Sequence, residues 1–299
     1  MSRPNALGEY LRARRELTDP ADVGLPGVGV RRTPGLRREE VAALAGISAD
    51  YYLRLEQGRD RNPSPQVLVA LARVFRLDGT ATEHLLSLSA VRPARPRRAR
   101  REMVPEGIRQ LLEAVNLPAF VESRTFEVLA ANRLATAVSP NIRPGVNRLR
   151  EVFLDPQERE LYMDWEQAVR GMVAGFRASI GGEVEDPRTA QLVGELSLAS
   201  DLFRRLWARH DVTALAGGAM RLQHPVVGRL DLRREKLPIA DTDGQILAVY
   251  HAEPGSESAR RLASLAAAAG DGAKTPASGS TAAGDGAKTP ASGSAAGTA

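Results

Sequence analysis

The sequence contains no cysteine, few aromatic residues and no long apolar run. Without cysteine the chain cannot form a disulfide framework, a thiolate zinc site, an iron–sulfur cluster or a cysteine nucleophile. Its four histidines are not spaced as metal ligands, so we expect no metal and no other cofactor. The lack of a run of about 18 apolar residues and of a signal-peptide core predicts a cytoplasmic protein without a membrane partner.

No pair of side chains typical of a catalytic site stands out either. His210 and Asp211 are neighbours on the chain, and His224 precedes a proline at the end of a predicted strand. General acid–base chemistry needs a proton donor and an acceptor that meet in space, and neither pattern predicts such a meeting. The sequence therefore favours a protein that is not an enzyme.

Hydrophobic residues at 43% and charged residues at 26% are typical of a globular protein with a buried core. Setting aside the low-complexity C-terminal end leaves roughly 270 residues, which predicts two domains. The charge is uneven, since residues 1–105 carry 19 basic and 12 acidic side chains, whereas residues 106–265 carry 20 and 22. The net positive charge thus lies in the N-terminal part.

Residues 38–57 have the pattern of two helices joined by a tight turn. RREEVAALA predicts an amphipathic helix that ends at Gly46, and Ser48 is placed to cap a second helix. Ala42 is small where the two helices must cross, and Gly46 suits the positive φ of the turn. These requirements, met together at fixed spacing, predict a helix-turn-helix rather than an ordinary helical hairpin. The predicted inward residues are Val41, Leu44, Ala45, Ile47, Tyr52 and Leu55.

A helix-turn-helix reads DNA with the outward side of its second helix. Ala49, Asp50 and Arg54 are predicted there, and Arg54 is best suited to donate two hydrogen bonds to one guanine. Asp50 either accepts from a cytosine amino group or orients Arg54. Tyr51 and nearby arginines are expected to contact phosphates. The predicted DNA-contacting residues are Arg31, Arg32, Arg37, Arg38, Ser48, Ala49, Asp50, Tyr51, Arg54, Arg59 and Arg61.

Composition divides the chain into four parts. We predict a five-helix helix-turn-helix domain over 1–90, an Arg- and Pro-rich linker over 91–105, a regulatory domain over 106–267 and a disordered repeat tail over 268–299. The linker is read either as a solvated hinge or as an additional phosphate contact, and both readings are compatible. The tail repeats AAGDGAKTPASGS, a composition that cannot bury a core.

The second domain mixes helices and strands. A capping box at Asp155 predicts a long helix over 156–180. The hydrophobic period then changes, and strands are predicted over 219–224, 228–234 and 245–252, with a turn between the last two. These elements predict an antiparallel sheet covered by helices.

Several of these segments resemble known families. LRREEVAALAGISADYYLRLEQG resembles the core signature of the Xre-type helix-turn-helix family, and this resemblance covers residues 7–90. Residues 105–265 resemble the MmyB-like C-terminal regulatory domain of actinobacterial regulators, through the motifs DPQERELYMDWE, FRRLWARHDV, HPVVGRLDL and QILAVYHAEPGSESARRL. The resemblance implies a multidomain α and α+β transcriptional regulator, in which a helix-turn-helix binds double-stranded operator DNA and a PAS-like domain holds a small apolar ligand. A fatty acid is the best candidate for that ligand.

One residue departs from the family pattern. The segment FEVLAANRLA has Ala131 before Asn132, where relatives usually carry tryptophan or another large residue. If this position lines the ligand pocket, the cavity of this chain is roomier and the ligand differs.

Apolar residues of the predicted helices and strands could enclose a chain-like ligand, although the same spacing is typical of an ordinary core. His210 either has a structural role at a helix end or domain boundary, or contacts the polar group of a ligand. With Arg133 and Arg221 it is a candidate to meet a carboxylate. The predicted ligand-binding residues are Arg133, Trp165, Phe176, Phe203, Trp207, His210, Met220, Arg221, Leu222 and Tyr250.

The sequence thus favours a ligand-responsive transcriptional regulator. A homodimer is expected, because a single helix-turn-helix reads only a half-site. The ligand is expected to reposition the two DNA-binding heads through the linker. Two alternatives remain open at this point: a second domain that is only a dimerisation platform, and an enzyme fused to a DNA-binding module.

Overall fold

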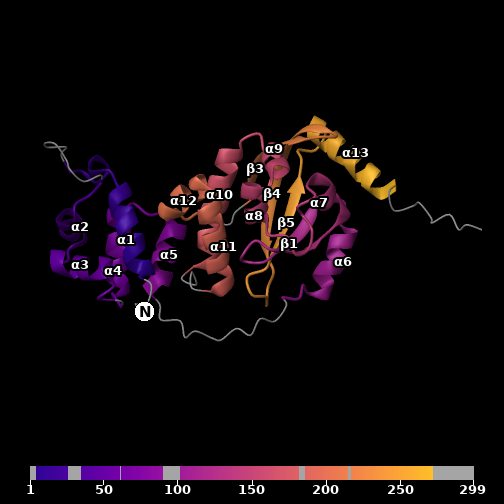
Figure 1. Cartoon of the computed structure of the whole chain (residues 1–299). Helices are drawn as coiled ribbons and strands as arrows, with labels where there is room; N and C mark the ends of the chain where they lie inside the picture. The colour runs from indigo at the N-terminus through magenta and orange to yellow at the C-terminus, as the bar shows by residue number, and fades with distance from the viewer. Residues whose placement is uncertain are drawn as a thin grey trace, which may run out of the picture.

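The fold is taken from a computed structural model that describes residues 5–25, 35–60, 62–89, 102–181, 186–214 and 217–271. Two domains stand side by side along the chain (Figure 1). The predicted DNA contacts of Arg31, Arg32 and Arg61, most of the linker and most of the repeat tail lie outside these residues. Across the described ranges, no helix is long and apolar enough to cross a membrane.

The first domain is helical, as predicted. Its elements are α1 (Ala6–Leu17), the 3-10 turn η1 (Pro20–Val23), α2 (Arg38–Ala45), α3 (Ala49–Glu56), α4 (Pro65–Val74) and α5 (Gly79–Ser89). Side chains of Asn5, Ser48 and Ser64 accept hydrogen bonds from the first turns of α1, α3 and α4. Gly46 has a φ of 67°, which confirms the left-handed turn between α2 and α3.

Most of the predicted core positions of the helix-turn-helix are confirmed. Val41, Tyr52 and Leu55 are fully buried, and Ala45 packs against the same core. Leu44 was predicted to face inward, which is wrong, because this side chain is 42% exposed. Val41 and Ala42 fill the contact with the neighbouring helices, and the 100° step of the helix carries Leu44 out to the side of that contact.

The second domain contains a five-stranded antiparallel sheet. Its strands are β1 (Ala119–Glu122), β2 (Val128–Ala131), β3 (Gly218–His224), β4 (Gly228–Pro238) and β5 (Ile246–His251). They lie in the order β2-β1-β5-β4-β3, so the N-terminal hairpin joins the C-terminal strands through the β1–β5 pair. Strand β4 extends beyond the predicted end at Arg234, because Arg233 to Pro238 pair with β5.

Eight helices accompany the sheet among the described residues. They are α6 (Glu106–Ala114), α7 (Arg133–Val138), α8 (Arg148–Leu154), α9 (Pro156–Leu161), α10 (Trp165–Ile180), α11 (Pro187–Ala199), α12 (Asp201–Ala208) and α13 (Glu257–Asp271). α7 and α13 pack against one face of the sheet, and α6 against the other. α8, α10, α11 and α12 form a helical core of their own, which stands between the sheet and the first domain (Figure 1). The predicted mixture of helical and α+β domains is confirmed.

The helix predicted over 156–180 is interrupted. Tyr162 pairs with Leu222 of β3, and the backbone N–H of Met163 donates to the carbonyl of Arg221. These strand-like contacts divide the segment into α9 and α10. The capping box at Asp155 predicts Glu158 as its second residue. The Glu158 carboxylate instead accepts a hydrogen bond from the hydroxyl of Ser139, at 2.5 Å.

Candidate functional site

α3, the helix predicted to read DNA, presents the expected residues to solvent. Ala49, Asp50 and Arg54 are exposed, whereas Tyr52 and Leu55 are buried against the rest of the domain. α2 and α3 lie at the end of the molecule away from the sheet, so the second domain does not cover them (Figure 1). The outward side of α3 is therefore open to a partner as large as a DNA duplex.

Two of these residues are already paired on the helix surface. The Arg54 guanidinium donates to the carboxylate of Asp50, one turn earlier, and it lies 5.7 Å from the centre of the Tyr51 ring. Between the two roles open for Asp50, this contact favours the one that orients Arg54. A guanidinium has five N–H donors, so donors remain for a guanine edge.

The flanking arginines differ in their surroundings. Arg37 and Arg59 are exposed at the ends of α2 and α3. Arg38 donates from Nε to Glu56 Oε2 at 2.7 Å, although its side chain is 42% exposed. A substitution of Arg38 would therefore disturb the fold as well as a phosphate contact. Arg59 is therefore better suited than Arg38 to a test of phosphate binding.

A buried ion cluster holds α3 in place, and sequence reasoning missed it. Glu56 is fully buried at the end of α3, where it accepts from Arg15 Nε at 2.6 Å and from Arg38. Burial alone would raise the pKa of Glu56, but the hydrogen bonds from Arg15 and Arg38 hold it below its ordinary value. Arg15 also donates to the carbonyl of Leu36 at 3.1 Å. The cluster thus ties α3 to α1 and α2.

We expect the substitution Arg54→Ala to remove about 1 to 3 kcal/mol of discrimination at one base pair, because a bidentate guanine contact is lost. Binding of an unrelated duplex should change little. Arg59→Ala is the matched comparison, and it should weaken all duplexes alike and flatten the salt dependence. Fluorescence anisotropy with point-mutated operator duplexes checks both. Equal weakening of every duplex by Arg54→Ala would reject the assignment of Arg54.

The predicted ligand-binding residues separate into four groups. Phe176, Phe203 and Trp207 are stacked within the core of α10 and α12, and Trp165 lies at its edge. Met220, Leu222 and Tyr250 pack on the sheet, under α7 and α13. Arg133 and Arg221 are exposed, and Arg221 pairs with Asp164 at 2.9 Å. His210 lies at the boundary with the first domain, 6.4 Å from the ring of Tyr10. The structure does not bring these residues around one cavity.

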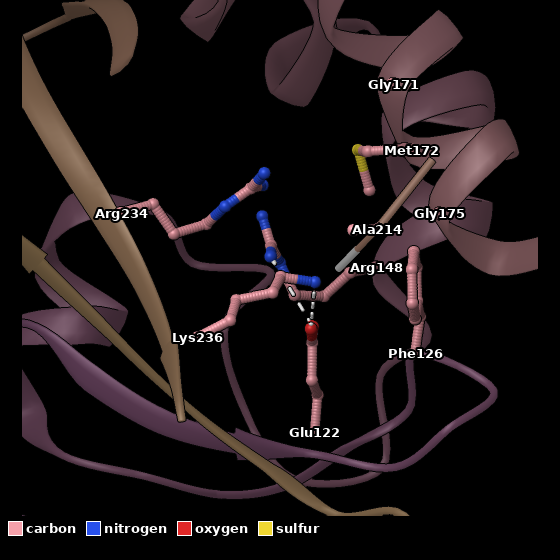
Figure 2. Close-up of a pocket in the computed structure, with 9 residues that line it drawn as sticks. All are labelled: Glu122, Phe126, Arg148, Gly171, Met172, Gly175, Ala214, Arg234 and Lys236. Atoms are coloured by element: carbon pink, nitrogen blue, oxygen red, sulfur yellow. Dashed lines mark hydrogen bonds and ion pairs between the residues drawn. The ribbon is translucent and has the colours of Figure 1, made fainter. Parts of the chain in front are cut away.

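A different set of residues surrounds a small cavity between the sheet and α10. It measures about 30 Å³ and is drawn in Figure 2. It is lined by Glu122, Phe126, Arg148, Gly171, Met172, Gly175, Ala214, Arg234 and Lys236. Figure 2 shows Lys236 from β4 and Arg148 from α8 reaching the carboxylate of Glu122 from β1, whereas the tip of Arg234, also from β4, lies farther from it; Met172 and Phe126 lie on the opposite side. The cavity is therefore charged on its sheet side and apolar on its helix side.

In this cavity the carboxylate of Glu122 lies close to two cationic side chains. Lys236 Nζ lies 2.7 Å from Glu122 Oε1, and Arg148 lies 3.7 Å from Glu122 Oε2. All three side chains are at most 4% exposed. Burial opposes ionisation of Glu122, yet Lys236 and Arg148 hold its pKa below the ordinary value. Burial in turn lowers the pKa of Lys236, against the attraction of Glu122.

Arg234 supplies additional positive charge. Its Nε is buried without a hydrogen-bond partner, and the hydroxyl of Tyr250 is in the same state. Among the residues that line the cavity, Arg148, Arg234 and Lys236 carry positive charge and Glu122 carries the one negative charge, so positive charge is in excess in the lining. Buried donors without partners are rare in folded proteins, and they often mark a place for a water, an ion or a ligand group.

The alternation of β4 could have revealed this cluster. Leu230 and Leu232 face the core, and the same period of two directs Arg234 and Lys236 to the same face. Lys236 is also the only lysine before the repeat tail, in a chain that otherwise uses arginine. Two cations on the buried face of a strand destabilise the fold unless they are paired or bind an anion.

Two family comparisons cover the two domains. Residues 104–265 match the model described as the MmyB-like transcription regulator ligand binding domain. Residues 6–85 match a helix-turn-helix domain model. A comparison with curated proteins finds no match.

Proposed function

Because the chain belongs to the family with an MmyB-like transcription regulator ligand-binding domain and also carries a helix-turn-helix domain, we propose that it controls transcription through a small anionic amphipathic ligand. The two families show that the chain is a DNA-binding transcription regulator with a ligand-sensing domain. The choice of an anionic ligand rests on the excess of positive charge among the residues that line the cavity beside Glu122.

On the DNA side, we propose that α3 enters the major groove with Arg54 as its main base reader. Its exposure, and its pairing with Asp50, support this role. Arg37 and Arg59 would position the helix on the phosphates. A homodimer is part of the proposal, since one α3 reads only a half-site and tight operators contain two.

On the ligand side, the proposal replaces the cations first expected to meet a carboxylate. Arg133 and Arg221 are exposed, whereas Arg148 and Lys236 are buried beside the cavity and the half-buried Arg234 also lines it. A carboxylate that entered this place would find charge-assisted hydrogen bonds, which are among the strongest in proteins. An anionic headgroup is therefore favoured over a neutral one.

The cavity also limits how a ligand enters. About 30 Å³ is the room of roughly one water molecule, so an acyl chain needs side chains to move. Met172 lines the apolar side and is the most adaptable of the core residue types. Gly171 is exposed at the mouth, and a Cβ placed there would meet nothing within 4 Å. We therefore propose that α10 yields when the chain of a fatty acid follows its headgroup inward.

We expect Arg234→Gln to weaken laurate binding by about 10- to 100-fold, the loss of one charge-assisted contact of about 1.5 to 3 kcal/mol. Arg233→Gln is the matched control, because Arg233 lies next to it on β4 and is 62% exposed. That control should bind laurate as the wild type does. Isothermal titration calorimetry of the delipidated full chain gives both constants.

Dodecanol separates headgroup recognition from general apolar binding. The wild type should bind this neutral analogue much more weakly than laurate, and Arg234→Gln should leave dodecanol binding unchanged. Equal affinity of the wild type for both compounds would contradict an anionic headgroup. Saturable binding of neither would favour a dimerisation platform, and native mass spectrometry would then give the oligomeric state.

A further inference from the structure

The two domains touch through a defined set of side chains. Arg14 of α1 donates to Asp211 Oδ1 at 2.8 Å and to the carbonyl of Arg209 at 2.7 Å, both just beyond α12. Val212 packs against the core of the first domain. We call this contact the domain seam, and it is formed by Tyr10, Arg14, His84, Arg177, His210 and Asp211.

The local backbone of the second domain positions Asp211, which accepts the hydrogen bond from Arg14. His210 has a φ of 52°, an uncommon conformation for a residue other than glycine, and it turns the chain out of α12. Arg209 Nε then donates to Asp211 Oδ2 at 2.7 Å, which leaves Oδ1 for Arg14. The carboxylate is thus held between an arginine of its own domain and an arginine of the other.

α10 connects the seam to the charged cavity. Gly171, Met172 and Gly175 of this helix line the cavity, and Arg177 lies half a turn further on. Arg177 stacks 3.7 Å from the centre of the Trp207 ring and donates to the Trp207 carbonyl at 2.6 Å. A movement of α10 at the cavity therefore moves the residue that supports the end of α12.

Packed aromatic rings form a second connection between the cavity and the seam. Phe126 lines the cavity, and its ring lies 5.6 Å from that of Phe176. The Phe176 ring lies 5.9 Å from that of Trp207. Packed aromatic rings transmit displacement because protein interiors have few voids. A ligand that displaced Phe126 would thus also press on the residues behind the seam.

Within the first domain, contacts of α1 link the seam to α3. Arg14 and Tyr10 belong to α1, and the next residue, Arg15, forms the buried pair with Glu56 at the end of α3. Tyr10 is fully buried and packs edge-on against His84 of α5, at 5.2 Å between ring centres. The first domain is thus packed as one body around α1, so a change in the seam would change the direction in which α3 points.

The seam is polar, and polar interdomain contacts within a chain favour relative motion of the domains. Arg14 and Arg209 both donate to the one carboxylate of Asp211, and the charge of Arg177 lies near it. The structure shows this contact closed, with Arg14 on Asp211, and breaking the pair would give an open state with both side chains in water. Allosteric coupling requires an element of this kind, which both sites can bias.

We propose that the domain seam, and not the Arg- and Pro-rich linker, sets operator affinity and carries the effect of the ligand to α3. The statement about the ligand rests on the proposed function, whereas the statement about operator affinity does not. The closed seam fixes the orientation of each α3 relative to its regulatory domain. In the proposed dimer this orientation decides whether both recognition helices reach their half-sites together.

The test compares Asp211→Asn with Asp201→Asn. Asp201 forms an exposed ion pair with Arg204 at the start of α12, and Asp211 lies just beyond the end of that helix, so the control makes the same substitution nearby on the chain without touching α1. A third protein carries a Gly-Ser-Gly-Ser insertion between Ala94 and Arg95. Operator duplexes selected from random sequences with the wild-type protein are titrated at one salt concentration, without any ligand.

We expect Asp211→Asn to weaken operator binding at least fivefold, the lower end of ordinary allosteric coupling. Asp201→Asn and the insertion should stay within twofold of the wild type. An increase of the same size in Asp211→Asn would also support the seam and would identify the closed form as the weaker binder. Unchanged affinity in Asp211→Asn, or a larger effect of the insertion, would overturn the proposal.

A distance measurement shows whether the substitution opens the seam. The chain has no cysteine, so Arg12→Cys on α1 and Leu198→Cys on α11 introduce the only two thiols, both at exposed positions. Spin labels there should give one narrow distance distribution in the otherwise wild-type chain and a broad one with Asp211→Asn. The same narrow distribution in both would count against a seam held by this ion pair.

Laurate added to the same titrations separates the two proposals. The wild type should change its operator affinity with laurate, and Asp211→Asn should bind laurate normally without such a change. If Asp211→Asn alters operator affinity but laurate alters it in neither protein, the ligand proposal fails and the seam stands. If laurate acts equally in both proteins, the seam is not its route.

Discussion

Replacing Glu56 by glutamine is expected to destabilise the DNA-binding domain by about 3 to 5 kcal/mol, since it leaves two arginines without their buried partner. Glu56 is fully buried, and the Arg15 side chain is 4% exposed. A small domain has only about 5 to 15 kcal/mol of stability, so this loss endangers the fold at physiological temperature. Operator binding should fall with it.

The chain offers both a control and a specific signal for this experiment. Glu16 lies 3.5 Å from the same Arg15 but is 47% exposed, so Glu16→Gln should cost less than about 1 kcal/mol. Both tryptophans, Trp165 and Trp207, belong to the second domain. Denaturation followed by circular dichroism should therefore show an earlier transition in Glu56→Gln, while the tryptophan fluorescence transition stays in place. Equal stability of the two variants would contradict the role of the buried cluster.

Acid is expected to open the domain seam before it unfolds either domain. Burial, with the nearby charges of Arg177 and Arg14, lowers the pKa of His84 to about 4 and that of His210 to about 3. Asp211 and the ring of Tyr10 also face these imidazoles. Both histidines are thus neutral in the closed seam, and protonation next to two arginines is unfavourable.

The sign of the effect follows from these values. Once exposed, a histidine has an ordinary pKa of about 6.5, so below that pH the open form takes up protons that the closed form does not. The closed seam is therefore fully favoured above pH 6.5 and loses stability as the pH falls toward 4. For His84 the gap between 6.5 and about 4 corresponds to about 3 kcal/mol.

One distance measurement, made on three proteins, follows this opening. The spin-label distance between α1 and α11 should broaden between pH 6.5 and 4, and the double variant His84→Gln/His210→Gln should broaden much less over that range. His251→Gln serves as the control, because His251 lies on β5, away from the seam. A distance distribution that stayed narrow in the wild type down to pH 4 would contradict neutral histidines in the closed seam.

Local sequence patterns predicted the helix-turn-helix and the C-terminal strands. Gly46 forms a turn and Ser48 caps a helix, and each affects only the few residues next to it. Such local signals do not depend on the rest of the chain. The strands β3 to β5 also follow from alternation and from their turns. The family resemblance supplied the kinds of domain, and both family comparisons agree with it.

Long-range pairing was beyond these patterns. Glu56 meets Arg15 across 41 residues, and Glu122 meets Lys236 across 114, so no spacing rule connects them. Arg14 and Asp211 are even further apart, at 197 residues. The break at Tyr162 has the same origin, since it depends on pairing with Leu222 of β3. In each case tertiary contacts decide which groups meet, and local propensity carries no information about that choice.

The most direct test of the account is one titration of a labelled operator with the full chain, at fixed salt, with and without saturating laurate. The account predicts that laurate changes operator affinity by roughly 5- to 150-fold in the wild type, the ordinary range of allosteric coupling. Arg234→Gln should lose this response at the same laurate concentration, and Arg233→Gln should keep it. An operator affinity that stays constant while laurate binds saturably to the wild type would contradict the account.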